Sequence, residues 1–454
     1  MRGSKAAMVA VVAMGLTVSA CGNDGTGDEQ VVESPPTAEQ PTESTPAETD
    51  SVKTPAPASS PVPTSASTTP PNPPAEELDV GSIAVFTSAE GLATDRVSGV
   101  VVGVDGTVWA TTEGDAPGTD DGLRYESYAR FDGSQFVDIG FPDLAVLDGP
   151  VEAFEDGVFG MDAAGGPDET LWLANTGFGS IGDIYHYDGS LWSSPVTHEA
   201  SLIRGAAAPD GSLWSISMAG VTVDDDDQVI GIGLMRVDDE GLEPQPLPDG
   251  GIPCGFCVEY GFDADGTLWM ASEHGLFGFD GEVWTPATAE LRELDGVGFA
   301  IGEGLWALGA DGSHWYLSQG NLTADGDDTY HLTRYDGDEM VTAPLTLEDP
   351  VIDRACVAEQ FDVDVETVTD DAVAHFDGKL SWGFQGLAGD REGDAWIALE
   401  CSGVYRIDVA TGAATRFGLE EGLPSLDLRA ITAHPDGSVW VATNAGLARI
   451  APGA

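Results

Sequence analysis

The stretch that decides the fold is PDGSVWVATNAGLARI, residues 435–450. An Asp-Gly pair between two apolar runs is typical of a tight hairpin turn, because the central residues of such a turn adopt positive φ angles. In the related stretch ADGTLWMAS, residues 264–272, alternate side chains would face opposite sides of the chain. Such alternation over a short run is typical of a half-buried strand. The stretch therefore predicts short antiparallel strands joined by tight turns.

The same phrase, an Asp-Gly turn or a close variant followed by a tryptophan, recurs along the chain. Its tryptophans are Trp109, Trp172, Trp214, Trp269, Trp315, Trp396 and Trp440. A second phrase follows most of them, as in YARFDG at 128–133 and LTRYDG at 332–337. Each unit then holds four short antiparallel strands, and repeats of this kind are typical of propeller blades. We predict an all-β fold, a β-propeller of seven four-stranded blades over residues 81–454.

The first and last units have complementary defects. The unit at 435–450 lacks a fourth strand, and the run SIAVFTSAEGL at 82–92 has no unit before it. That run is similar to TRFGLEEGL at 415–423, the fourth strand and exit turn of the unit before the last. We therefore expect a strand at about 82–88 to complete the C-terminal blade, since circular closure removes exposed strand edges.

The number of blades depends on residues 341–373. This segment is either a degraded eighth blade or an insertion. We favour the insertion and seven blades, because the segment contains no Asp-Gly-x-x-Trp hairpin of the kind that a blade needs.

A family resemblance rests on these motifs. The stretch EGLPSLDLRAITAHPDGSVWVATNAGLARI at 421–450 resembles the two-component regulator propeller repeat, and the chain is more distantly similar to streptogramin lyase propellers. The resemblance extends over 81–454 and is weakest at 341–373. It implies a seven-bladed propeller, but no single activity, because the repeat is architectural.

The N-terminal 80 residues are expected to be outside the fold. Residues 1–20 combine basic residues, a short apolar run and small residues before Cys21, which resembles a bacterial lipoprotein signal. An ordinary signal peptide that ends at a cysteine is the alternative. Residues 21–80 are rich in Pro, Ser, Thr and Glu and predict a disordered tether. Acylation of Cys21, for example with palmitate, would anchor the protein on the extracytoplasmic face of the cell membrane.

The net charge of −61 excludes nucleic acid and anionic membrane surfaces as partners, because both would be repelled. Strong acidity also favours a soluble monomer. Beyond Cys21, the cysteines are Cys254, Cys257, Cys356 and Cys401. An even number outside the cytoplasm favours disulfides, and we favour the pairs Cys254–Cys257 and Cys356–Cys401. A zinc or redox role for Cys254 and Cys257 is the weaker alternative.

Catalytic motifs of the GxSxG, GxxxxGK[ST] and HExxH types are absent from the sequence. Streptogramin lyases use histidine and glutamate with a divalent metal, and the pair Glu273–His274 is weakly similar to that pattern. An acidic run inside the third blade could bind calcium, which prefers carboxylate oxygens from flexible loops. Its residues are Asp224, Asp225, Asp226 and Asp227. Solvated loop tips are the alternative.

The sequence therefore predicts a membrane-anchored, extracytoplasmic propeller that binds a ligand, senses it, or interacts with a protein. The ligand would be a protein, a peptide or a glycan, with no cofactor except possible calcium and no assigned catalytic residue. A lyase or hydrolase with a site on the channel face, with or without a divalent metal, is one alternative. A wall-associated scaffold is another.

Overall fold

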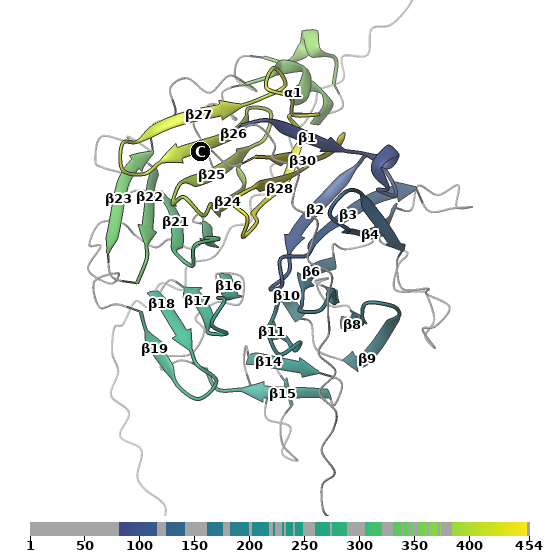
Figure 1. The fold of residues 1–454 in the computed structure, drawn as a ribbon, viewed down its shortest axis with the longest axis vertical. Helices are drawn as coiled ribbons and strands as arrows, with labels where there is room; N and C mark the ends of the chain where they lie inside the picture. Colours follow the sequence, from purple (N-terminus) through teal and green to yellow (C-terminus); the bar gives the residue numbers. More distant parts are fainter. Residues whose placement is uncertain are drawn as a thin grey trace, which may run out of the picture. The chain divides into compact units, whose positions relative to one another are not determined.

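A computed structural model gives the fold (Figure 1). It describes residues 81–115, 124–140, 161–175, 182–198, 202–217, 221–222, 229–230, 233–238, 241–247, 259–272, 275–287, 305–319, 330–337, 339–345, 347, 352–360, 363–369, 373 and 384–451. The predicted signal, Cys21 and the tether lie outside these residues. No helix among them is long and apolar enough to cross a membrane.

Seven four-stranded antiparallel sheets form the fold, as predicted. Blade 1 consists of β2 (Val97–Val102), β3 (Val108–Asp115), β4 (Arg124–Phe131) and β5 (Phe136–Gly140). Blade 2 consists of β6 (Met161–Gly165), β7 (Leu171–Asn175), β8 (Gly182–Tyr187) and β9 (Trp192–His198). Blade 3 consists of β10 (Leu202–Ala207), β11 (Leu213–Ser217), β14 (Gly233–Asp238) and β15 (Gly241–Gln245). Blades 4 and 5 are β16 (Glu259–Phe262), β17 (Leu268–Ser272), β18 (Gly275–Phe279), β19 (Trp284–Pro286); and β20 (Leu305–Leu308), β21 (His314–Gln319), β22 (Tyr330–Tyr335), β23 (Met340–Leu345). Blades 6 and 7 are β24 (Phe384–Gly389), β25 (Ala395–Leu399), β26 (Gly403–Asp408), β27 (Ala413–Phe417); and β28 (Leu428–Ala433), β29 (Val439–Thr443), β30 (Gly446–Ile450), β1 (Ile83–Phe86).

The first strands of the blades lie at the centre of a ring. Each of them contacts the first strand of the next blade, and β28 contacts β2, so the ring is closed (Figure 1). Neighbouring strands within a blade are antiparallel, so the Asp-Gly turns all lie at one end of the ring, which we call the turn face. The links between second and third strands, and between blades, lie at the other end, the connection face.

The predicted closure by the N-terminal strand is confirmed. β1 pairs with β30 in antiparallel register, with Ile83 opposite Ile450 and Phe86 opposite Leu447. β1 is shorter than the predicted strand at about 82–88. It ends before Thr87, whose side chain caps the 3-10 turn η1 (Ser88–Glu90).

The segment between blades 5 and 6 is an insertion, not an eighth blade. Its described residues form helix α1 (Arg354–Gln360) and the 3-10 turn η5 (Val365–Thr367) after β23. Val357 and Cys356 of α1 are buried and pack against core residues of blades 6 and 7. The insertion is therefore docked on the propeller.

The repeat tryptophans lie on the second strand of each blade, where they pack between blades. Trp109, Trp172, Trp315, Trp396 and Trp440 are almost completely buried. Trp315 of blade 5 lies so close to Gly389 of blade 6 that a Cβ built on this glycine would be 2.0 Å from the indole nitrogen. Only glycine fits there, which explains a small residue at the end of β24.

Candidate functional site

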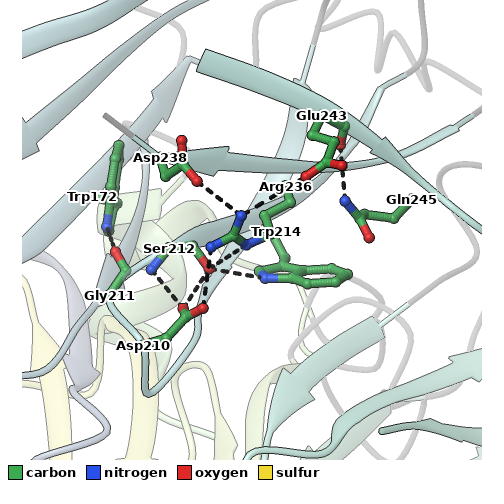
Figure 2. A network of polar contacts seen from close by, with 9 residues as sticks. All are labelled: Trp172, Asp210, Gly211, Ser212, Trp214, Arg236, Asp238, Glu243 and Gln245. Carbon is green, nitrogen blue, oxygen red and sulfur yellow. Dashed lines mark hydrogen bonds and ion pairs between the residues drawn. The ribbon is translucent and has the colours of Figure 1, made fainter. Parts of the chain in front are cut away.

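A network of polar contacts surrounds the repeat tryptophans on the turn face (Figure 2). In blade 3, Asp210 accepts hydrogen bonds from the backbone and side chain of Ser212, and Arg236 forms an ion pair with Asp210 at 3.2 Å. The indole of Trp214 donates to the Ser212 hydroxyl. The neighbouring blade joins this network, because the indole of Trp172 donates to the carbonyl of Gly211.

The same arrangement recurs in other blades. Five of the seven tryptophans lie directly opposite an arginine on the third strand. The pairs are Trp109–Arg130, Trp214–Arg236, Trp315–Arg334, Trp396–Arg406 and Trp440–Arg449. In blade 2 the place of the arginine is taken by His186, which stacks on Trp172 at 3.9 Å between ring centroids. These contacts are part of the scaffold, so the repeat tryptophans do not form a ligand site.

The sequence contained a signal for these arginines that the motif search did not use. Each stands at the third position of a four-residue run at the start of, or inside, the second phrase, as in YARF, LMRV, LTRY and VYRI. A search for the residue opposite each tryptophan would have found them.

The connection face differs between blades in a way that the repeat does not predict. The first strands of blades 1, 6 and 7 each contain one extra residue relative to the strand beside it. These residues are Ser98, Gln385 and Arg429. Such a β-bulge re-aims a side chain and is common next to active sites. A fourth register shift lies between Ile203 and Ala206 of blade 3. Because blades 6, 7 and 1 are adjacent in the ring, three bulges with polar residues follow one another on this face.

A carboxylate group gathers beside the bulges of blades 6 and 7. Glu400, just after β25, is 9% exposed and accepts a hydrogen bond from the amide of Gln385 at 3.1 Å. Asp427, just before β28, is 4% exposed and makes a two-point ion pair with Arg429, at 2.8 and 2.9 Å. Burial raises the pKa of Glu400, and the charge of Asp427 raises it further. Arg429 and Gln385 oppose this shift.

A second polar group continues the site from blade 7 to blade 1. Arg96, just before β2, donates to the side chain of Asn444 at 3.1 Å and forms an ion pair with Glu113 at 3.4 Å. The amide of Asn444 donates in turn to Glu359 of α1 at 3.5 Å. The insertion thus reaches across blade 7 to an arginine of blade 1. We call the two groups together the connection-face site: Gln385, Glu400, Asp427, Arg429, Asn444, Arg96, Glu113 and Glu359.

The predicted disulfide Cys356–Cys401 is present, with the two Cα atoms 5.3 Å apart. It joins α1 to the residue that follows Glu400. The backbone of Cys401 has a φ of 57°, its amide donates to Leu426, and its carbonyl accepts from Asp353. Bridge and backbone bonds together fix the insertion at the edge of the connection-face site.

The other predicted site residues lie outside the described part of the chain. This holds for Cys254, Cys257, the pair Glu273–His274 and the acidic run. The acidic run is Asp224, Asp225, Asp226 and Asp227, and it is flanked by the paired strands β12 (Val221–Thr222) and β13 (Val229–Ile230). Within the described ranges, no group of three or more His, Cys, Asp or Glu residues could hold a metal ion.

Comparisons with known proteins give only structural likenesses. No protein-family model matches the sequence, and no curated protein is significantly similar to it. Among solved structures, an inactive variant of virginiamycin B lyase from Staphylococcus aureus with quinupristin is 11% identical, with a TM-score of 0.46 over 81% of this chain and 98% of that chain. YCF48 bound to D1 peptide is 13% identical, with a TM-score of 0.45 over 83% and 99%.

The extracellular domain of a putative hybrid two-component system from B. thetaiotaomicron is 15% identical, with a TM-score of 0.43. That match covers 82% of this chain but only 42% of the other.

Proposed function

We propose that this protein is a membrane-anchored, extracytoplasmic propeller that binds a ligand on its connection face. The observation that carries the proposal is the run of three bulges in blades 6, 7 and 1, which places Gln385, Arg429 and Ser98 on neighbouring first strands. The fold itself does not require these departures, because the first strands of blades 2, 4 and 5 form blades without a bulge. Ligand recognition explains why polar residues occupy them.

The site contains the groups that a small ligand or a peptide end requires. It combines two amides, two guanidinium groups and four carboxylates, and Arg96 and Arg429 keep 42% and 40% of their side-chain surface exposed. A few placed polar groups of this kind fix the orientation of a ligand. The opposite, turn face is occupied by the regular Asp, Ser and Arg contacts that hold the tryptophans.

A binding screen tests the proposal. Peptide, oligosaccharide and metabolite pools are added to the full chain, and thermal unfolding is followed, since a ligand that binds only the folded state raises its stability. A compound that raises the unfolding temperature of the wild type should no longer do so in the Gln385→Ala and Arg429→Ala variants. The matched control is Arg391→Ala, which removes an exposed arginine from the turn face. Hits that persist in both site variants would contradict the proposal.

Membrane anchoring is tested separately. We expect the wild-type chain to fractionate with membranes and to partition into detergent, and the Cys21→Ala variant to be released in soluble form. Unchanged fractionation of the variant would count against the lipid anchor but not against the ligand site.

The alternative of a lyase or hydrolase rests on Glu400. Burial raises the pKa of this carboxyl, and a raised pKa is a property of general acids. Mass spectrometry of each hit after incubation with the protein distinguishes the two functions. Turnover that Glu400→Gln abolishes would favour the enzyme, and recovery of the unchanged hit would favour binding.

A further inference from the structure

Glu400 is a nearly buried carboxylate with no ion-pair partner among the residues that the structure describes. Within those residues its one hydrogen-bond partner is the amide of Gln385, at 3.1 Å. The closest arginine in the group, Arg429, is already engaged on both oxygens of Asp427. Buried charges in proteins are usually paired, because an unpaired carboxylate loses its hydration without compensation.

The surroundings of Glu400 increase the need for a positive charge. Asp427, itself buried, lies close enough to repel the Glu400 carboxylate. With Arg429 counted, the blade 6 and 7 part of the site has one carboxylate in excess. On the blade 1 side, Arg96 faces the two carboxylates Glu113 and Glu359 through direct contact and through Asn444. The excess of carboxylates that the inference uses is the one in blades 6 and 7.

From this geometry we infer that Glu400 is the recognition carboxylate for a cationic group on the ligand, either an ammonium or a guanidinium as carried by a basic peptide. The inference rests on the proposed function of the connection-face site. A cation beside Glu400 would supply the missing charge, and a charge-assisted hydrogen bond to it is stronger than a neutral one. The large negative charge of the whole chain would also attract such a ligand from solution.

Three capped tripeptides test the inference by calorimetric titration of the full chain. Their central residues are lysine, arginine and citrulline, which has nearly the shape of arginine but no charge. We expect at least one cationic peptide to bind about tenfold or more tightly than the citrulline peptide, as expected for a hydrogen bond between charged groups. Preference for lysine or for arginine identifies an ammonium or a guanidinium as the recognised group.

Two variants assign the effect to one residue. Glu400→Gln keeps the shape of the side chain and can still contact Gln385, and it should abolish the preference for the cationic peptides. Glu282→Gln removes the same charge from an exposed turn of blade 4 and should leave the preference intact, which excludes a general attraction by the acidic surface. Thermal unfolding of both variants verifies that they are folded.

Three results would overturn the inference. These are an affinity for both cationic peptides no higher than that for the citrulline peptide, a preference for the cationic peptides that Glu400→Gln leaves unchanged, and no binding of either cationic peptide. The proposed function would survive if a neutral or anionic ligand from the screen bound and lost its affinity in Gln385→Ala but not in Glu400→Gln. It would fail together with the inference only if no ligand depended on Gln385 or Arg429.

Discussion

At the scale of single residues, Arg449 shows how each blade fixes its tryptophan. Its guanidinium lies over the ring of Trp440 at 5.5 Å and forms an ion pair with Asp436 at 2.8 Å. Ser438 connects the two, since its hydroxyl donates to Asp436 and accepts from Arg449. Burial raises the pKa of Asp436, but hydrogen bonds from His434 and Ser438 outweigh burial and leave the pKa lowered. The carboxylate is therefore charged and available to Arg449 at neutral pH.

Replacing Arg449 with methionine should lower the free energy of unfolding by about 2 kcal/mol, because a charged hydrogen bond and a cation–π contact are lost together. Arg449 is only 11% exposed, so solvent compensates little. Urea unfolding measures the loss. The control Arg391→Met, on an exposed turn, should change stability by less than about 0.5 kcal/mol. Equal losses in the two variants would refute a stabilising role for the contact.

His314 should make stability depend on pH. This histidine is buried beside Trp269, 4.4 Å between ring centroids, and burial lowers its pKa to about 4. In the unfolded chain its pKa is about 6.5. Above that pH the histidine is neutral in both states, and its contribution to the free energy of unfolding is fully present. The contribution is lost as the pH falls from about 6.5 to about 4, and amounts to roughly 3 kcal/mol.

Urea unfolding at several pH values checks this prediction. In the His314→Phe variant, the part of the pH dependence between 6.5 and 4 that stems from this residue should disappear, and the carboxylates should leave the remainder. A variant with the same slope as the wild type over that range would show that His314 does not control it.

At the scale of elements, the sequence was sufficient to predict the strands that belong to the repeated phrase. The Asp-Gly turn and the tryptophan placed the second strand in every blade, and SIAVF at 82–86 predicted the strand that pairs with β30. The bulges could not be predicted in the same way. One extra residue such as Gln385 leaves the spacing of the phrase unchanged, and only the pairing of β24 with β25 reveals it.

The contact between Glu400 and Gln385 was hidden for a related reason. Gln385 is on β24 and Glu400 follows the neighbouring β25, whereas Asp427, whose charge acts on Glu400, belongs to the next blade. Only the closure of the ring brings blade 1, with Arg96, next to blade 7. Motif searches detect residues that are close in sequence, so a site assembled from three blades escapes them.

The disulfide Cys356–Cys401 should stabilise the insertion more than the blades. The bridge closes a loop with a sequence separation of 45 residues, for which the chain-entropy model gives about 4 kcal/mol. In the double variant with both cysteines replaced by serine, we expect lower thermal stability and faster hydrogen exchange in α1 than in β25 and β26. Unchanged protection of α1 would show that Asp353 and the packing of Val357 suffice to hold it.

At the scale of the whole molecule, the net charge of −61 should oppose folding through repulsion among carboxylates. Sodium chloride should therefore raise the melting temperature, because salt screens repulsion between exposed charges. Calcium chloride at equal ionic strength separates screening from binding. A larger rise with calcium that is lost on replacing Asp224 to Asp227 by asparagine would support a metal site, whereas equal rises would indicate screening alone.

Ring closure by β1 gives the final prediction. The amide of Ala451 donates to the carbonyl of Ser82 at 3.0 Å, and Ile83 is opposite Ile450. A circular permutant that begins at Ala93 and carries residues 82–92 after Ala454 would turn this pair into an ordinary hairpin. We expect it to be as stable as the wild type to within about 1 kcal/mol, since no native contact of β1 changes.

Deletion of residues 81–92 is the comparison variant for the permutant, because it removes β1 instead of relocating it. It removes Phe86 from its stacking contact with Trp440 and leaves the edge of β30 unpaired. Because an exposed edge is a template for pairing with another chain, the deletion variant should lose several kcal/mol and associate at concentrations where the permutant is monomeric. Urea unfolding and light scattering of both variants measure these effects. A stable, monomeric deletion variant would show that blade 7 folds with three strands and that the pairing of β1 with β30 does not stabilise the ring.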